Sequence, residues 1–172
     1  MQIRNATKSD FVQIHKIYDQ GYDEAKENHD FGDYLRLTRP DTKRKRNWTK
    51  EMQSDIKKGN VLFFVAEENN SIVGFCYVKK KDIPDSELSH VGVLGIRILK
   101  EFRRQGLGTK LISKALNESK GKFEIIEAYI MSINRASKSI FKKFGFRIWG
   151  TAPGYVKRGN RYIDMEYMYL KL

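Results

Sequence analysis

The fold of this chain is decided by the stretch Arg103-Arg104-Gln105-Gly106-Leu107-Gly108-Thr109, which links two apolar patterns of different period. Upstream, residues 91–99 read Val-Gly-Val-Leu-Gly-Ile-Arg-Ile-Leu, an apolar and β-branched run with the length of a buried strand. Downstream, apolar residues recur on one helical face: Leu107, Leu111, Ile112, Ala115 and Leu116. The pattern therefore predicts a strand, a basic glycine turn and a helix in direct succession.

This turn has two features that suit a phosphate-rich ligand. Gly106 and Gly108 let the backbone come close to a ligand, and glycine adopts φ values that other residues resist. The first turn of a helix offers N–H groups without an internal partner, together with the positive end of the helix dipole. The junction is therefore predicted to cradle a pyrophosphate. A surface turn whose glycines only ease chain reversal has the same local sequence and is the structural alternative.

Other ligand patterns find no support in the sequence. Leu111 stands where a dinucleotide-binding fingerprint requires its third glycine, and no G-x-x-x-x-G-K-[ST] motif is present. The single cysteine, Cys76, excludes an intramolecular disulfide framework. The histidines (His15, His29 and His90) are scattered, so the ligand spacing of a metal site is missing. No metal is expected.

Length and composition predict one soluble domain over residues 1–172, with 40% hydrophobic residues to form its core. No apolar run approaches the ~20 residues of a membrane span, and the first residues lack the apolar core of a signal peptide, so we expect a cytoplasmic protein without a membrane partner. The net charge of +12 attracts anions such as coenzyme phosphates, acidic protein surfaces or nucleic acid. A nucleic acid is not the expected partner, because no recognised nucleic-acid-binding motif is present.

The hydrophobic patterns predict an α/β fold with a mixed central sheet and helices on both faces. Residues 7–10 form a capping-box pattern that opens a helix. Pro40 interrupts the polar stretch 21–60, which predicts two short helices with a basic connection. The last strands are expected at 146–149 and 164–170, separated by a loop rich in Gly, Arg and Tyr.

Taken together, these motifs resemble the GNAT superfamily of acyl-CoA-dependent N-acetyltransferases over nearly the whole chain. Residues 3–10 look like the family's opening strand and helix cap, and residues 94–108 look like its coenzyme-binding signature. Residues 134–146 are similar to the family helix N-x-x-A-x-x-[LI]-Y-x-x-x-G-F. Residues 161–168 look like the closing segment of bacterial and archaeal members, such as ribosomal-protein-alanine and polyamine acetyltransferases.

The resemblance implies a single domain with a mixed, mostly antiparallel sheet of about seven strands and about four helices. It implies direct transfer of an acetyl group from acetyl-CoA, the co-substrate, to a primary amine in a ternary complex. The acceptor would be a protein N-terminus or lysine, or a small polyamine-like amine; a homodimer stays open. Acidic side chains in the segment 21–60 favour a cationic amine, whereas the basic surface favours an acidic carrier. These side chains are Asp23, Glu24, Glu27, Asp30 and Asp33.

The resemblance also assigns coenzyme contacts. The backbone of residues 96–98 would bind the pantetheine arm as an added strand, and N–H groups of residues 104–109 would hold the pyrophosphate with the charges of Arg103 and Arg104. Asn134 would hydrogen-bond the pantetheine arm, and its structural role as a helix cap is compatible with this. Ser137 would add a polar contact to the coenzyme, or it is simply an exposed helical serine. The expected coenzyme-binding residues are Ile96, Arg97, Ile98, Arg103, Arg104, Gln105, Gly106, Leu107, Gly108, Thr109, Asn134 and Ser137.

Both proton-transfer roles stay open, because the sequence departs from the family at two positions. Gly92 stands where some relatives carry a catalytic glutamate, and Phe141 where many carry the tyrosine that protonates the thiolate. His90 is a candidate base, and Tyr155 and Tyr162 are candidate acids. A structural histidine and packing tyrosines are the alternatives, and a water or backbone donor would also serve. Because Gly92 and Phe141 depart from the family pattern, a second hypothesis stays open: a non-catalytic protein that senses acetyl-CoA or CoA.

Overall fold

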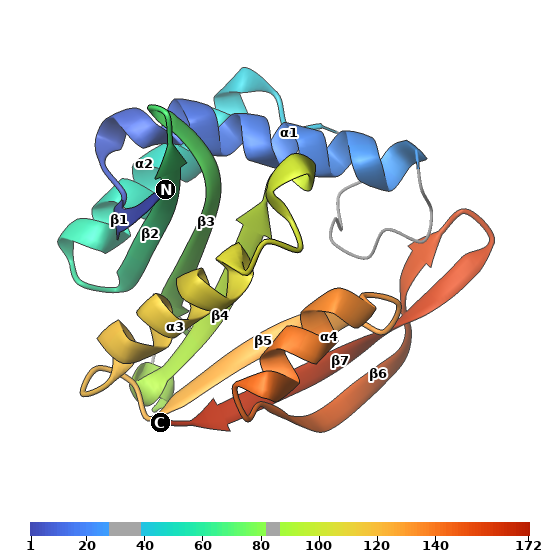
Figure 1. The fold of residues 1–172 in the computed structure, drawn as a ribbon. Coiled ribbons are helices and arrows are strands. Elements are labelled where there is room, and N and C mark those ends of the chain that lie inside the picture. The colour runs from blue at the N-terminus through green and yellow to red at the C-terminus, as the bar shows by residue number, and fades with distance from the viewer. Residues whose placement is uncertain (28–38, 82–86) are drawn as a thin grey trace.

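Strands from both ends of the chain meet in one seven-stranded sheet in the computed structural model, which describes residues 1–27, 39–81 and 87–172 (Figure 1). The strand order is β1-β2-β3-β4-β5-β7-β6, and every neighbouring pair is antiparallel except β4 with β5. The expected mixed and mostly antiparallel sheet of an α/β fold is confirmed. The strands are β1 (Gln2–Asn5), β2 (Val61–Glu68), β3 (Ser71–Lys80), β4 (Val91–Ile98), β5 (Ile125–Met131), β6 (Arg147–Arg158) and β7 (Arg161–Lys171).

The described residues hold four α-helices, two on each face of the sheet (Figure 1). Helices α1 (Phe11–Glu27) and α2 (Thr42–Lys57) pack on β2 and β3 through one apolar cluster that includes Ile14, Met52 and Phe75. Helices α3 (Leu107–Ser119) and α4 (Arg135–Lys143) cover the other face through the larger cluster. Burial of one apolar stripe per helix therefore gives the sheet a core on each side.

Helix α1 begins directly after the predicted capping box. The Asp10 carboxylate accepts from the backbone N–H of Thr7 at 2.6 Å and from both terminal nitrogens of Arg4 at 2.7 and 2.9 Å. The helix then continues through Gly21 to Glu27 and so runs into the stretch 21–60. A Cβ at Gly21 would lie 2.5 Å from Nη1 of Arg97, and the glycine therefore makes room for a guanidinium.

The stretch 21–60 also differs from two short helices with a basic connection. Its first residues belong to α1, and α2 has 16 residues, which include the basic run 43–46. Asp41 caps α2 by accepting from the backbone N–H of Arg44 at 2.7 Å. Residues 28–38 of this stretch, and the expected loop residues 82–86, lie outside the described part of the chain.

The end of the chain forms a long hairpin in place of the expected loop. Strands β6 and β7 have 12 and 11 residues and pair as far as Arg158 with Arg161. Register shifts between Ile148 and Gly150 and between Ala152 and Val156 bend the ribbon, and Gly154 takes a φ of +60°. Figure 1 shows the hairpin end projecting beyond the rest of the sheet. Bulges and a left-handed glycine thus continue a strand where the composition predicts a loop.

The parallel pair β4–β5 is short, and the two strands then diverge. Only residues 91–93 of β4 pair with residues 125–127 of β5. Beyond them β4 stays paired with β3, and β5 stays paired with β7, so a wedge-shaped gap opens between two fixed strands (Figure 1). The backbone of β4 from Leu94 onward therefore faces this gap and has no strand partner in β5.

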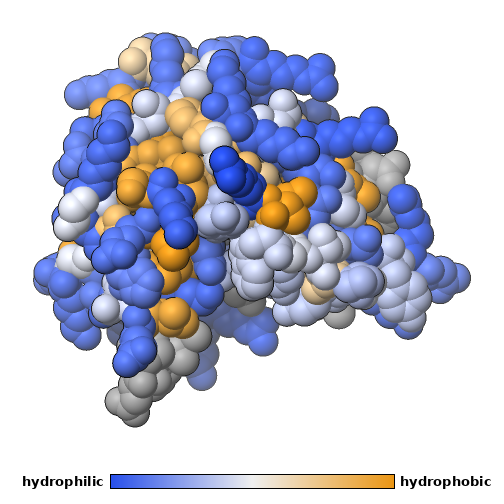
Figure 2. Space-filling view, turned by 90° about the horizontal axis from the view of Figure 1, so that it is seen from below, coloured by the Kyte–Doolittle hydropathy of each residue, from blue (hydrophilic) through white to orange (hydrophobic). Residues whose placement is uncertain are grey.

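The surface is predominantly polar. Seen from below, hydrophilic side chains cover much of the face in Figure 2, and the largest hydrophobic patch lies on its left, with smaller ones right of the centre. This agrees with a chain in which 31% of the residues are charged. Within residues 1–27, 39–81 and 87–172, no helix has the length and apolarity that a bilayer crossing requires.

Candidate functional site

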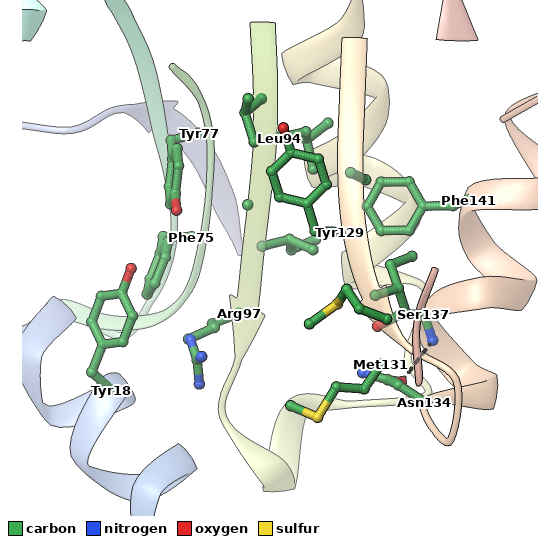
Figure 3. A pocket seen from close by; sticks show the side chains of 16 residues that line it. Tyr18, Phe75, Tyr77, Leu94, Arg97, Tyr129, Met131, Asn134, Ser137 and Phe141 are labelled. Atoms are coloured by element: carbon green, nitrogen blue, oxygen red, sulfur yellow. Dashed lines mark hydrogen bonds between the residues drawn. The ribbon is translucent and has the colours of Figure 1, made fainter. Parts of the chain in front are cut away.

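The gap between β4 and β5 opens into a cavity that six elements line, with Met165 as the contribution of β7 (Figure 3). Residues of β4 and β5 form its middle, β3 and α1 contribute the aromatic side shown on the left, and α4 closes the other side. Side chains of β4 alternate across it: Leu94, Ile96 and Ile98 join the core under α3, whereas Gly95 and Arg97 lie toward α1. The cavity thus has a helix-α4 side and an aromatic side.

The predicted glycine turn forms the entrance to α3. Gly106 caps the helix with a φ of +77°, and no atom lies within 4 Å of the position that its Cβ would take. Arg104 also has a positive φ, +61°. Gly108 packs closely, because its Cβ would lie 3.1 Å from Cδ1 of Ile140. An open concave backbone at a helix N-terminus is the geometry that binds phosphate groups, so these residues fit the diphosphate of acetyl-CoA.

The two arginines of the turn are placed differently. Arg103 donates through Nη1 and Nη2 to the Glu24 carboxylate at 2.6 and 2.9 Å, and through Nε to the carbonyl of Ile98 at 2.9 Å. Its guanidinium therefore ties α1 to the turn. Arg104 is exposed, so its side chain can add positive charge next to a phosphate bound at this entrance.

Arg97 is close to the expected coenzyme position only through its backbone. Ile96 and Ile98 flank it on β4, where the gap exposes their peptide groups. Its guanidinium points to the aromatic side and lies 4.9 Å from the centre of the Tyr18 ring, a cation–π arrangement (Figure 3). The side chain thus belongs to the aromatic side of the cavity.

The predicted residues of α4 do line the cavity. Oδ1 of Asn134 accepts from the backbone N–H of Ser137 at 3.0 Å, which is the helix cap expected from the sequence (dashed line in Figure 3). Phe141 is 3% exposed and packs edge-to-face on Phe146, with ring centres 4.9 Å apart. The cavity wall is therefore apolar where the resemblance places a tyrosine.

The predicted catalytic residues are not brought together. His90 lies at the closed end of β4, where Nδ1 is 3.1 Å from the carbonyl oxygen of Glu87 and the ring borders a separate hollow. Tyr155 and Tyr162 lie in the β6–β7 hairpin, are 64% and 65% exposed, and do not line the cavity. A Cβ at Gly92 would lie 2.5 Å from Val78, within the apolar core. A carboxylate there would not face the acceptor side.

Sequence reasoning missed a polar cluster around a buried glutamate beside the cavity. The Tyr129 hydroxyl donates to Oε2 of Glu127 at 2.6 Å, and Nζ of Lys81 donates to the same oxygen at 2.8 Å. Glu127 is 8% exposed, while Tyr129 lines the cavity. Burial, followed by the hydrogen bond to Glu127, raises the pKa of Tyr129. The available signal was a glutamate within an apolar strand, residues 125–131, because buried carboxylates are rare unless paired.

The aromatic side of the cavity is built around a glycine. A Cβ at Gly95 would lie 2.4 Å from Cζ of Tyr77, so the Tyr77 ring can lie across β4 because residue 95 has no side chain. Burial raises the pKa of Tyr77. Tyr18 and Phe75 extend this surface, with their ring centres 5.1 Å apart.

Two of the acidic side chains expected near the acceptor are ion-paired: Asp23 with Arg39, and Glu24 with Arg103. Glu27 is exposed at the end of α1. Asp30 and Asp33 lie outside the described residues.

Comparisons with known proteins identify the family and the fold. The model of the acetyltransferase (GNAT) family matches residues 12–146. N-alpha-acetyltransferase 50 of Danio rerio is 27% identical over 114 residues, which are 65% of this chain and 67% of that protein. Two solved structures share the fold. Ribosomal-protein-alanine N-acetyltransferase from Brucella melitensis has a TM-score of 0.84 and 22% identity over 100% of both chains. A putative acetyltransferase from Salmonella typhimurium with its cofactor acetyl-CoA has a TM-score of 0.86 and 23% identity over 100% of this chain and 94% of that one.

The family match covers most of the chain and includes the glycine turn, the β4–β5 gap and all of α4. The enzyme class that follows is an acetyl-CoA-dependent acyltransferase. The chain belongs to the acetyltransferase (GNAT) family.

Proposed function

We propose that this protein transfers the acetyl group of acetyl-CoA to a primary amine by direct attack in a ternary complex. The observation that carries the proposal is an unpaired strand edge that lines the cavity and is followed along the chain by an open helix N-terminus. Neither feature alone distinguishes a transferase from a nucleotide-binding protein. Together they suit a diphosphate joined to an extended amide-containing arm, which is the form of coenzyme A.

The chain positions the thioester through main-chain groups. Val93 and Ile98 are separated by about 16 Å along the strand. An extended pantetheine arm is of comparable length, so a diphosphate at Gly106 puts the thioester near the point where β4 and β5 part. A backbone N–H of residues 94–98 is then available to the oxyanion of the tetrahedral intermediate.

The acceptor amine approaches from the aromatic side, toward α1. Of the two acceptor classes left open by the sequence, the ion pairs of Asp23 and Glu24 favour a protein amine over a polyamine, because they remove the local negative charge that would attract a polycation. The net charge of +12 favours an acidic carrier protein. We therefore place a protein N-terminus or lysine first among the acceptors.

One observation favours a second function, an acetyl-CoA or CoA sensor of the same fold. Phe141 has no proton to give to the departing thiolate, and it is buried in the cavity wall. A thiolate is a good leaving group, so turnover does not require an acid at this position. The catalytic function remains the first proposal.

Thiol release from acetyl-CoA tests both functions. The purified chain is assayed with an alanine-initiated tetrapeptide, Nα-acetyl-lysine amide and spermidine, and acetyl-CoA binding is measured in parallel. We expect sustained release that is faster with the peptide or the lysine derivative than with spermidine. Saturable binding without release from any acceptor would favour the sensor, and the absence of binding would overturn both functions.

A further inference from the structure

The cluster of Tyr129, Glu127 and Lys81 has features that packing alone does not require. Its carboxylate is buried, and two donors converge on one oxygen, Oε2, at 2.6 and 2.8 Å. A buried carboxylate is costly without partners, and Lys81 supplies the counter-charge. Tyr129 connects this buried charge to the cavity, because its side chain lines the cavity while its hydroxyl contacts Glu127.

Tyr129 lies where β4 and β5 begin to diverge. Glu127 is the last residue of β5 that pairs with β4, and Tyr129 is the next residue on the same face. Tyr129 is therefore the first side chain of β5 to face the acceptor side after the strands part (Figure 3). This is the place where the thioester lies if the proposed function holds.

We propose that Tyr129 carries a proton from the acceptor amine to Glu127, and that Lys81 and Glu127 position and complete this relay. The inference rests on the proposed function and identifies the proton acceptor that the sequence left open. Tyr129 acts as the catalytic residue because its oxygen contacts the amine. Lys81 acts only through Glu127 and is a positioning residue.

The relay balances for an acceptor that binds as an ammonium. The hydroxyl oxygen of Tyr129 accepts one proton from the nitrogen while its own proton passes to Oε2 of Glu127, and product release returns that proton to solvent. The nitrogen lone pair then forms the N–C bond, and the C–S bond breaks with its electron pair on sulfur. Of the two remaining nitrogen protons, one stays on the amide and one ends on the thiol.

Burial keeps Tyr129 in the neutral form that the relay needs. Its pKa is raised by desolvation and by its hydrogen bond to Glu127, so the hydroxyl keeps its proton at neutral pH. A neutral phenol donates one hydrogen bond and accepts another, which lets it bridge two proton carriers. The titratable and charged groups that face it are Glu127, Lys81, Tyr167, Tyr77, Tyr18 and Arg97.

Two variants test the relay, Tyr129→Phe and Glu127→Gln, in the acceptor assay described above. We expect kcat/KM at pH 7 to fall about 100-fold in both, the scale of a lost general base, with unchanged affinity for acetyl-CoA. Only acceptor that is already neutral then reacts, so the deficit narrows as the pH rises toward the pKa of the amine. A purely structural defect would lower the rate by the same factor at every pH.

Matched controls lie on the neighbouring strand. Tyr167→Phe removes a hydroxyl from the ring that packs against Tyr129, with centres 5.4 Å apart. Glu166→Gln breaks another part-buried ion pair, with Lys138 at 3.0 Å, on the α4 face. We expect both to keep the wild-type pH profile.

The outcomes separate the relay from the function on which it rests. The relay alone is overturned if the wild type turns over and Tyr129→Phe keeps kcat/KM within twofold of the wild-type value at pH 7. It is also overturned if Tyr129→Phe lowers kcat/KM by the same factor at all pH values. No wild-type turnover overturns the proposed function, and the relay with it. If Glu127→Gln fails to fold, Tyr129→Phe decides, since it keeps the ring and removes one hydroxyl.

Discussion

Single residues decide how closely the strands and rings of the cavity approach. Gly95 is the clearest case, because the Tyr77 ring occupies the space that a side chain on β4 would need. Gly21 plays the same part for the guanidinium of Arg97. At both positions glycine serves a close contact rather than an unusual backbone angle.

Gly95→Ala tests this packing. The new methyl group would lie 2.4 Å from Cζ of Tyr77, so we expect the free energy of unfolding to fall by about 1–3 kcal/mol, the usual cost of overpacking. Gly150→Ala in β6 is the control, because nothing lies within 4 Å of its Cβ position. That variant should be neutral or more stable by at most about 1 kcal/mol. Urea denaturation measures both, and equal effects would contradict the assigned contact.

Single residues also show which features can be predicted from the sequence and which cannot. Asn134 was predicted as a helix cap and is one, because a cap depends on residues only three apart. Glu127 and Lys81 are 46 residues apart, and only the pairing of β4 with β5 brings them together. The family pattern pointed to positions 92 and 141, whereas the polar side chains beside the reacting end come from β5. Long-range pairing of this kind leaves little trace in local sequence.

At the level of elements, two polar contacts hold α1 in place. Arg4 and Asp10 fix its first turn, and Glu24 joins its last turns to Arg103 in the coenzyme turn. Helix α1 therefore connects the aromatic side of the cavity with the entrance of α3. The sequence predicted the start of α1 from a local motif, whereas the contact of Gly21 with Arg97 depends on the packing of α1 on β4.

The pair of Arg103 with Glu24 should be coupled more strongly than a surface ion pair. A double-mutant cycle of Arg103→Gln and Glu24→Gln should give a coupling energy of about 1–2 kcal/mol, since two charge-assisted hydrogen bonds join them and Glu24 is 12% exposed. The control is the exposed pair of Lys114 and Glu118 in α3, expected at no more than about 0.5 kcal/mol. Similar couplings in the two cycles would show that α1 is not tied to the turn in this way.

The start of α1 should make stability depend on pH in the acid range. The hydrogen bond from Arg4 lowers the pKa of Asp10 in the folded chain. The stabilisation is therefore complete above the unfolded pKa of about 3.9 and is lost as the pH falls through the folded value. Asp10→Asn should lower the free energy of unfolding by about 2 kcal/mol at pH 7 and make it depend less on pH in the acid range. An unchanged pH dependence in that range would contradict the role given to the Arg4–Asp10 contact.

The hairpin β6–β7 shows the other limit of prediction at this level. Its glycines and arginines are typical of a loop, and only cross-strand pairing with bulges makes the segment a strand. The predicted strands at its ends were correct, since alternation over apolar residues is a local signal. The two predicted tyrosines consequently lie along an exposed ribbon rather than above the cavity.

On the scale of the whole molecule, the sheet consists of two parts that share a short seam. Strands β1–β4 form one part and β5–β7 the other, and three residue pairs join them. This arrangement was predicted as a fold class from element order and family motifs. The position of the seam was not, because the divergence of β4 from β5 has no periodic signature.

Acetyl-CoA should stabilise the whole chain by occupying this gap. At 100 times its Kd, a ligand of the folded state adds about 2.7 kcal/mol, which for a domain of this size raises Tm by roughly 5–10 °C. Arg104→Gln should weaken binding and reduce its dependence on salt, because this exposed arginine adds charge at the entrance. Lys50→Gln on α2 makes the same change in charge on the other face and should leave Kd unchanged. Differential scanning fluorimetry over a salt series measures all three.

The unpaired edge of β4 has a consequence for how such a protein tolerates mutation. Peptide N–H and C=O groups are common to nearly every amino acid, so a donor substrate that is read by them survives most substitutions along that edge. Proline is the exception, since it removes the N–H. Because the main chain binds the donor, the side chains along this edge are not needed for donor binding. They can therefore vary in sequence to suit different acceptors, which allows one fold to serve many amines.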